Sequence, residues 1–481
     1  MTIKAQMPMF MAEQIKAIDE ASLRILEKAG ILLEDEEMRA ILASFGCVVD
    51  GRRVWLPRKF IEEQLEQVPS QFILYTRDGS QPLTIGGEER TVTNSGVAPY
   101  IYDLETRELR PSTLQDVKDT TRVLDALPRA GIICATLVEP TDVAPELTIV
   151  KSFEATLRNT TKPIVGPGLT KAAEAKSVLE MGVALRGSVA ALAERPLFAP
   201  WFCPLSPLTY SGDLVAAMRI CAQAGLPLAF VTNPMAGLTA PLTLAGALAQ
   251  MHAELLAAIV LSQLIQPGLP VLYEGTASVV DLHKLVAVSG RPETALLKQA
   301  AVLLGKYRGL PTTGFGLSAS MSKTIDVEYG YEKAASALVC ALAKPSILGG
   351  IGLFGGGVCA SYESLIIDHE IVGFLWHLLD GVRINEDTLA VAVVQEAMEG
   401  THFITHRHTL AHLRTGEYWT PTLSDSLSFN EWIGLGMPGA LSRAREKALD
   451  ILGNYAVPPL PPKADQRLET VMREAEKALV M

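Results

Sequence analysis

Apolar and polar positions alternate along the chain with two different spacings from residue 91 onward. Short apolar runs typical of buried strands are each followed by a longer segment with the periodicity of an amphipathic helix. The predicted strands are Thr91–Asn94, Gly131–Ala135, Pro163–Val165, Leu197–Phe202, Pro227–Val231, Pro270–Tyr273, Leu310–Thr313 and Ser346–Ile351. The predicted helices are Thr113–Ala126, Glu146–Asn159, Lys171–Leu185, Ser211–Ala224, Leu242–Ile265, Pro292–Tyr307, Asp326–Leu342 and Ser361–Asp380. Eight strands that are each followed by a helix predict an α/β fold of the closed (β/α)8, or TIM barrel, type.

Two flanking segments differ from this alternation. Residues 1–90 combine amphipathic helices with the strand-like runs Phe72–Thr76 and Leu83–Ile85, which predicts an N-terminal α+β extension. Residues 401–481 are expected to form a helical C-terminal extension that packs on the barrel. The expected organisation is therefore an extension over residues 1–90, a barrel over residues 91–400 and a second extension over residues 401–481.

The segment Pro345–Glu370 stands out because a strand-like run leads into a glycine-rich loop and then into a helix. Six glycines lie between Gly349 and Gly357, and glycine permits positive φ and close approach of the backbone. A phosphate site is one interpretation of such a loop. No acidic residue follows at the spacing that a nucleotide ribose would need, and no GK[ST] follows. A tight turn in a packed barrel is the other interpretation, and both remain open.

Composition and charge narrow the classes of function. The chain has 481 residues, a formal net charge of −11 and no cluster of Lys and Arg, so we expect no nucleic-acid partner. The apolar runs are shorter than a membrane span of about 18 residues, and the N-terminus lacks the blocks of a signal peptide. Six scattered cysteines without a CxxC pair favour a reducing cytoplasm.

The ends of the predicted strands carry mostly neutral and aromatic side chains. They lack a strand-end lysine for a Schiff base, a paired set of carboxylates and an HxH metal motif. Aromatic faces with a single acid suit a cation that cannot donate a hydrogen bond, such as a quaternary ammonium group. Each aromatic residue could instead plug the end of the barrel. The candidate binding residues are Tyr100, Trp201, Phe202, Asn233, Glu274, Phe315 and Phe354.

A second cluster, HxxxHxHxxxH, contains His402, His406, His408 and His412. Histidine is the commonest metal ligand, so the cluster is typical of a metal site. The alternative is that these imidazoles form hydrogen bonds back onto the barrel. A metal-dependent barrel enzyme that uses these histidines is accordingly the rival hypothesis for function.

Two stretches, GYEKAASALVCALAKPSILGGIGLFGGGVCASYESLIIDHEIVGFL and GTHFITHRHTLAHLRTGEYWTPTL, resemble the trimethylamine methyltransferase family. The N-terminal AIDEASLRILEKAGI and the block from Pro270 to Leu310 are similar to it as well. The resemblance implies a (β/α)8 barrel that moves a methyl group from an amine to the Co(I) of a separate corrinoid protein.

Departures from the family pattern bear on the substrate. The founding branch carries pyrrolysine at a strand end, which corresponds to Ile351–Phe354 here, whereas this chain has only standard residues there. Non-pyrrolysine members act on quaternary ammonium compounds such as glycine betaine, proline betaine and carnitine. Glu274 stands where a small residue is expected and His369 where Asn is expected, and both departures bear on specificity.

The leading hypothesis is therefore a betaine:corrinoid protein methyltransferase that works by SN2 displacement. The aromatic residues would form a cage for the cation, Asn233 would bind the carboxylate, and Gly352, Gly355 and Gly356 would leave room for the corrin ring. The cobalamin would belong to the partner corrinoid protein, so we expect no permanently bound cofactor and no resident metal. We also expect a homo-oligomer. A non-catalytic subunit that binds quaternary amines or docks the corrinoid protein is the remaining alternative.

Overall fold

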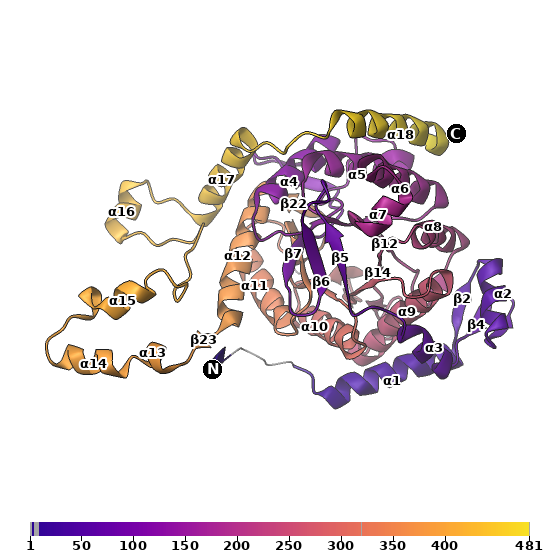
Figure 1. Cartoon of the computed structure of the whole chain (residues 1–481), viewed down its shortest axis with the longest axis horizontal. Coiled ribbons are helices and arrows are strands. Elements are labelled where there is room, and N and C mark those ends of the chain that lie inside the picture. Colours follow the sequence, from indigo (N-terminus) through magenta and orange to yellow (C-terminus); the bar gives the residue numbers. More distant parts are fainter. Residues whose placement is uncertain (1, 4–8, 319, 481) are drawn as a thin grey trace.

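Eight parallel strands lie at the centre of the part of the chain that the structure describes, and helices surround them (Figure 1). The structure is a computed structural model that describes residues 2–3, 9–318 and 320–480. One parallel sheet contains, in order, β10 (Ile133–Cys134), β11 (Ile164–Gly168), β12 (Phe198–Phe202), β14 (Leu228–Thr232) and β16 (Val271–Gly275). A second contains β19 (Thr313–Gly314), β20 (Ile347–Ile351) and β7 (Thr91–Asn94). Each strand overlaps one predicted from the apolar runs, so these predictions are confirmed.

The two parallel sheets contact each other at both edges. A single parallel bridge pairs Tyr273 of β16 with Thr312, next to β19, and the Tyr273 amide donates to the Pro311 carbonyl at 2.9 Å. At the other edge, the side chain of Asn94 in β7 takes the place of a backbone ladder. Its Oδ1 accepts from the Cys134 amide at 2.8 Å, and its Nδ2 donates to the Cys134 carbonyl at 3.2 Å.

A helix follows each central strand, as the sequence predicts. The eight helices are α4 (Leu114–Ala126), α5 (Thr148–Asn159), α6 (Ala172–Arg186), α8 (Gly212–Gln223), α9 (Leu244–Ile265), α10 (Pro292–Tyr307), α11 (Val327–Ala341) and α12 (Tyr362–Asp380). Polar side chains fix where several of them begin, because the first amides of a helix have no partner within it. Thr113 caps α4 in this way, and Asp326 caps α11.

An N-terminal hairpin closes one end of the space between the strands. The hairpin is formed by β5 (Gln71–Tyr75) and β6 (Pro82–Gly86), and it lies in front of the strands in Figure 1. Its apolar residues form one cluster with inward-facing side chains that come from six of the central strands or from residues next to them. That cluster consists of Phe72, Leu74, Ile85, Ile132, Val165, Ala199, Ala229, Leu272 and Ile347. Since the N-terminal end is filled, a ligand can reach the interior from the C-terminal ends of the strands.

The rest of residues 9–90 forms the expected α+β extension. It contains α1 (Ala12–Lys28), β2 (Ile31–Leu33), α2 (Glu36–Ser44), β3 (Val48–Asp50), β4 (Arg53–Trp55) and α3 (Arg58–Leu65). Helices α1 and α3 pack on α9, and β2 pairs with β13 (Thr209–Tyr210) in the loop after β12. The extension is thereby attached to the central part of the molecule.

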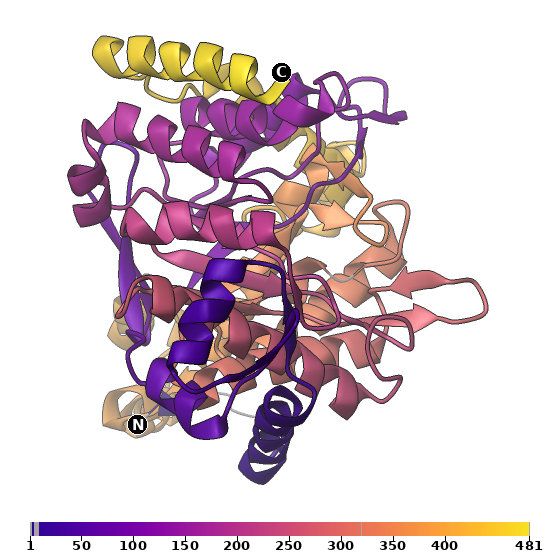
Figure 2. The ribbon, with the colours of Figure 1, turned by 90° about the vertical axis from the view of Figure 1, so that its right-hand side faces the viewer.

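Loops at the C-terminal ends of the strands contain short strands that the sequence did not reveal. A four-stranded sheet combines β8 (Tyr100–Tyr102) and β9 (Leu109–Pro111) with β21 (Leu353–Phe354) and β22 (Cys359–Ser361). A hairpin of β17 (Ser278–Asp281) and β18 (Val286–Val288) projects at the right-hand edge of Figure 2 and also pairs with β15 (Met235–Ala236). A short helix, α7 (Val189–Glu194), precedes β12.

The C-terminal segment divides into a packed part and a protruding arm. Helix α17 (Ala440–Asn454) packs on α12 and α4, and α18 (Pro462–Val480) packs on α6 and α5. Residues 381–439, called the arm below, stand away from the other helices in Figure 1. They contain β23 (Val382–Arg383), α13 (Glu386–Leu389), α14 (Val391–Met398), α15 (Arg407–His412) and α16 (Phe429–Gly434). The last surrounding helix ends at Asp380, so the boundary expected at residue 400 falls inside the arm.

Helix α9 is long and apolar enough to cross a membrane by length and composition alone, and it is the one such helix among the described residues. However, 83% of its most apolar 18-residue window is buried inside the protein. Burial of this kind is typical of a core helix, so α9 is weak evidence for a membrane span.

Candidate functional site

A cavity of about 220 Å3 opens beside the C-terminal ends of β10, β11 and β12. Its walls include Cys134, Ser152, Pro167, Trp201 and Cys203. The indole of Trp201 lies directly over Gly168, where a Cβ atom would come within 2.5 Å of the ring. Only glycine leaves room there for the ring. The local sequence of β11 thus positions the aromatic wall of the cavity.

Glu274 in β16 is a buried carboxyl group close to this cavity. The charge of the Glu274 carboxylate adds to the effect of burial on Cys134, a residue of the cavity wall, and both raise the pKa of its thiol. Burial raises the pKa of Glu274 itself to about 7, and the nearby Thr313 hydroxyl acts in the opposite direction. Burial also raises the pKa of Cys134 to about 12, so this thiol is not an activated nucleophile.

The environment of Glu274 is unusual because its carboxylate has no positively charged side chain beside it in the part of the chain that the structure describes. Among the described residues, no Lys, Arg or His side chain forms an ion pair with it, although it is only 4% exposed. Buried charges are normally paired, and an unpaired one is costly. A cationic ligand would supply the missing charge, and the Trp201 indole on the same interior side of the strands offers an aromatic face that suits a cation.

Trp201 and Phe202 were both predicted to line the site, and the structure separates them. Successive side chains of a strand point to opposite faces. Trp201 packs with the inward-facing cluster, whereas Phe202 is fully buried among the surrounding helices, with its ring centroid 6.3 Å from that of Phe230. The prediction that Phe202 contacts the ligand is therefore corrected, because its ring belongs to the packed core.

Phe354 also departs from the prediction. Its ring is completely buried and lies edge-on to Tyr329 at 5.6 Å and stacked on Tyr102 at 6.0 Å. These neighbours hold the ring within the wall formed by α11 and the small sheet of β8 and β22. Phe354 thus stabilises the loop and does not line the cavity described above.

The remaining predicted binding residues occupy different parts of the C-terminal face. Phe315 is half-buried, and its ring lies over Gly349 of β20 at 3.0 Å from the position of a Cβ atom. Asn233 is exposed, and its Oδ1 accepts from the Ser278 hydroxyl at 2.7 Å. Tyr100 is exposed on β8. None of the three lines the cavity beside Trp201, and their contact with a ligand stays a prediction.

The glycine-rich loop is a packed turn whose amides are already used. The Gly352 amide donates to Asp368 Oδ2 at 2.7 Å, and the Gly356 amide donates to the Ser320 carbonyl at 2.8 Å. All five glycines from 350 to 357 have positive φ, which explains the residue type. This geometry favours the tight-turn interpretation over a phosphate site. Of the glycines expected to leave room for a corrin ring, Gly352 and Gly355 are buried and Gly356 is half-buried.

A buried ionic network behind this loop was missed in the sequence. Asp368 of α12 accepts from Lys333 Nζ at 2.9 Å and from the Tyr329 hydroxyl at 2.6 Å, in addition to the Gly352 amide. Lys333 and Asp368 are both completely buried. The available signal was a charged residue on the apolar face of each of two helices, but their pairing depends on contacts between distant segments.

His369, the second departure from the family pattern, lies away from the cavity. Its Nε2 accepts from the Arg129 amide at 3.3 Å, and Arg129 precedes β10, at the N-terminal end of that strand. Burial, reinforced by the Arg129 charge, lowers the pKa of this imidazole to about 3. The expected influence of His369 on specificity is therefore not supported by its position.

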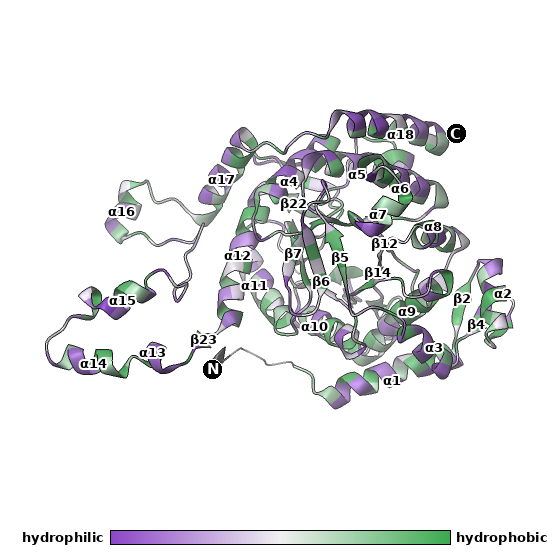
Figure 3. Ribbon diagram, in the orientation of Figure 1, coloured by the Kyte–Doolittle hydropathy of each residue, from purple (hydrophilic) through white to green (hydrophobic). Residues whose placement is uncertain are grey.

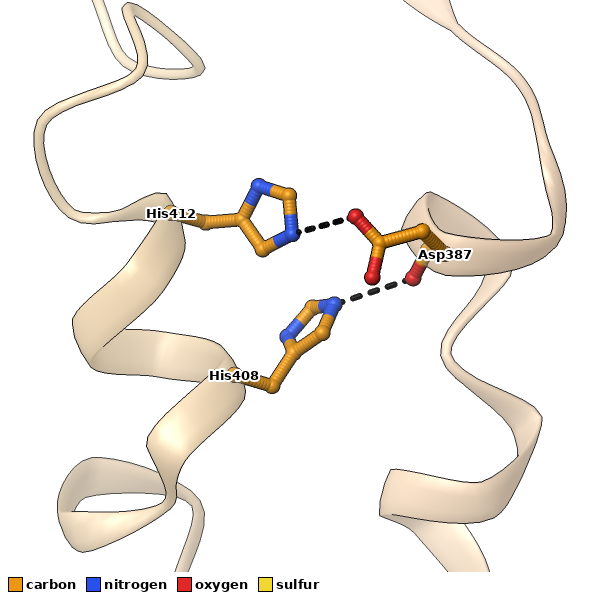
Figure 4. A group of neighbouring side chains, drawn as sticks. All are labelled: Asp387, His408 and His412. Atoms are coloured by element: carbon orange, nitrogen blue, oxygen red, sulfur yellow. Dashed lines mark hydrogen bonds and ion pairs between the residues drawn. The ribbon is translucent and has the colours of Figure 1, made fainter.

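The histidine cluster lies in the arm and not at the strand ends. His408 Nε2 lies 3.0 Å from the Asp387 carbonyl, and His412 Nε2 lies 3.0 Å from Asp387 Oδ2 (Figure 4). His406 is engaged separately by Glu396 at 3.0 Å, and His402 is exposed. Since these groups stand outside the ring of helices, they are poorly placed to do chemistry in the cavity.

Comparison with known proteins shows which family has a similar sequence. Residues 2–479 match the family described as trimethylamine methyltransferase (MTTB). A glycine betaine methyltransferase of Desulfitobacterium hafniense (strain Y51) is 32% identical over 97% of this chain and 96% of its own. A trimethylamine methyltransferase, MttB, of D. hafniense (strain DSM 10664 / DCB-2) is 31% identical over 97% of this chain and 94% of its own. Among solved structures, the monomethylamine methyltransferase MtmB of Methanosarcina barkeri aligns with a TM-score of 0.49 at 11% identity, covering 97% and 93% of the two chains.

Proposed function

Because this chain belongs to the trimethylamine methyltransferase family and is an enzyme of the methyltransferase class, we propose that its methyl donor is a quaternary ammonium carboxylate. Glycine betaine, proline betaine and carnitine are the candidate donors, and the Co(I) of a separate corrinoid protein is the acceptor. The observation that carries the proposal is the unpaired, buried carboxyl of Glu274, which points to the same interior side of the strands as the Trp201 indole. The relative named as a glycine betaine methyltransferase, at 32% identity, supports the same class of donor.

The chemistry that we propose needs no proton transfer. The cobalt(I) attacks the methyl carbon from the side opposite the nitrogen, so a cobalt–carbon bond forms while the nitrogen–carbon bond breaks. The bonding electron pair leaves with nitrogen, and the product is a neutral tertiary amine. This agrees with a cavity whose Cys134 thiol is unreactive and with a buried Glu274 carboxyl that has no charged acid or base partner among the described residues.

Glu274 and Trp201 would act mainly on binding and orientation. The substrate nitrogen is positively charged in the ground state and loses that charge as the methyl group departs. A carboxylate beside it therefore stabilises the bound substrate more than the transition state. Accordingly, Glu274 would lower KM without raising kcat, and the rate would come from alignment of the methyl group and exclusion of water.

We further infer that the eight parallel strands close into a (β/α)8 barrel. The bridge between Tyr273 and Thr312 and the Asn94 side chain support closure at the two edges where ladders are short or missing. Substrate would then lie at the C-terminal face, where the corrinoid protein must also dock. The free thiols of all six cysteines support the expectation that the enzyme works in a reducing cytoplasm.

Ligand binding tests the donor class directly. We expect glycine betaine to raise the melting temperature of the protein, while trimethylamine at the same concentration does not. Calorimetry should show that Trp201→Ala weakens betaine binding by about 1–2 kcal/mol, roughly 5- to 30-fold, as expected for a partly desolvated cation–π contact. Tyr418→Ala, which removes an exposed aromatic ring in the arm, is the matched control and should bind normally.

Methyl transfer to a reduced corrinoid protein completes the test, because binding alone would also fit a non-catalytic subunit. Turnover with a betaine would exclude that alternative. A thermal shift with trimethylamine but not with betaines would contradict the proposed donor. A Trp201→Ala variant that titrates like the wild type would place the cation elsewhere on the C-terminal face.

A further inference from the structure

The arm has almost no hydrophobic core of its own. Among its described residues, only His406 and Leu423 are buried, and Leu423 belongs to a cluster of the main body. Its helices are short: α13 has four residues, α15 has six, and α14 has eight. Helices of this length are not stable in isolation, and a small segment without a hydrophobic core of its own usually needs a disulfide, a metal or a partner to remain folded. Because the six cysteines are free, no disulfide supplies that constraint.

Three side chains of the arm converge on one point. His408 and His412 are four residues apart on α15, so both imidazoles project from the same face of the helix. Both direct Nε2 toward Asp387 of α13, and their ring centroids are 4.3 Å apart (Figure 4). The ligand atoms of the three residues all lie within 4.8 Å of one another.

This set of atoms matches the requirements of a zinc ion. Two imidazole nitrogens and one carboxylate oxygen are ligands that Zn2+ accepts, and water would occupy the fourth position. Tetrahedral bonds of about 2.0–2.1 Å place ligand atoms about 3.3 Å apart. His412 Nε2 and Asp387 Oδ2 are already 3.0 Å apart, so the main adjustment is a rotation of His408 away from the Asp387 carbonyl.

We propose that Asp387, His408 and His412 bind a divalent transition-metal ion, with Zn2+ as the best match, which joins α13 to α15 and holds the arm in shape. This replaces the expectation that the protein has no resident metal. The ion is structural, because its ligands lie in the arm and outside the cavity beside Trp201. The proposal does not depend on the identity of the methyl donor.

Metal titration of the full-length protein tests the site. After treatment with EDTA and dialysis, we expect one Zn2+ per chain to bind in calorimetry, and Co2+ to give the visible absorption of a tetrahedral complex. His408→Ala and His412→Ala should each weaken binding at least 100-fold. His402→Ala removes an exposed histidine of the same segment and should leave binding unchanged, which makes it the matched control.

Limited proteolysis provides a second readout that is independent of activity. Removal of the metal should make residues 381–421 sensitive to protease while the rest of the chain stays resistant, and added Zn2+ should restore protection in the wild type but not in His412→Ala. Failure of the dialysed protein to bind Zn2+, or binding that survives both the His408 and His412 substitutions, would overturn the proposal. Circular dichroism verifies that each variant is folded.

Discussion

Glu274 is a residue whose position on a strand was visible in the sequence but whose electrostatic state depends on the fold. Burial raises its pKa to about 7 from an ordinary value of 4.5. The folded protein therefore holds a proton at pH values where the unfolded chain has lost it. A bound quaternary ammonium ion favours the carboxylate form, so the ligand offsets the cost of ionising this group in an apolar setting.

We predict that Glu274→Gln is more stable than the wild type at pH 8 and about equally stable at pH 5. The pKa of this carboxyl is about 7 in the folded protein and about 4.5 in the unfolded chain. The wild type therefore has its full free energy of unfolding below pH 4.5 and loses about 3 kcal/mol of it as the pH rises to about 7. Urea unfolding at the two pH values measures the difference. Glu139→Gln, at an exposed carboxylate of the cavity edge, is the matched control. A stability difference that is equal at pH 5 and pH 8 would contradict a buried, ionisable Glu274.

The glycine-rich loop after β20 illustrates how one element depends on two others. Its shape needs positive φ at several glycines, and its Gly352 amide is held by Asp368 of α12. Asp368 is in turn paired with Lys333 of α11, which also donates to the Leu317 and Gly350 carbonyls. The buried ion pair thus fixes the conformation of the loop. Its net contribution to the free energy of unfolding is small, because burying the two charges costs about as much as their attraction provides.

A double-mutant cycle tests this support. Asp368→Asn should lower the free energy of unfolding by about 3–5 kcal/mol, because it leaves the Lys333 ammonium buried without a counter-charge. Adding Lys333→Met removes that charge, while the oxygen of the introduced side-chain amide can still accept from the Gly352 amide. We therefore expect the double variant to be more stable than the single Asp368→Asn variant in urea unfolding. Simple additivity of the two single effects would show that the two side chains are not coupled.

At the scale of the whole molecule, the arm exposes more large apolar side chains for its length than the packed part of the chain. Helices α14, α15 and α16 carry green, hydrophobic positions and stand away from the ring of helices in Figure 3. Phe403 is 55% exposed and Ile404 is 81% exposed. Monomeric proteins rarely expose contiguous apolar patches of large size, so the arm fits the expectation that this chain is a homo-oligomer.

We predict that light scattering will give the mass of an oligomer for the full chain, and that Phe403→Glu combined with Ile404→Glu will reduce it toward one chain. Burial of two carboxylates in an apolar interface would disfavour association. Val48→Glu introduces the same charge at an exposed apolar position on β3 and should leave the mass unchanged. A monomeric mass for the wild type at tens of micromolar would contradict the prediction.

The sequence by itself determined the alternation of strands and helices, the two strands of the N-terminal hairpin and membership of the methyltransferase family. These features follow from local periodicity and from motifs that are contiguous in the chain. It also placed Trp201, Glu274 and Phe315 at strand ends. The helix predicted to end at Asp380 was confirmed, although the position of α13 and α14 in the arm was not foreseen.

Only the tertiary structure decided which side chains face the interior. Strand alternation requires Trp201 and Phe202 to point in opposite directions, but the packing of the helices determines which of them faces inward. The pairing of Lys333 with Asp368 and the convergence of His408 and His412 on Asp387 likewise join segments far apart in the chain. Such contacts depend on how whole elements pack, so periodicity along the chain carries no information about them.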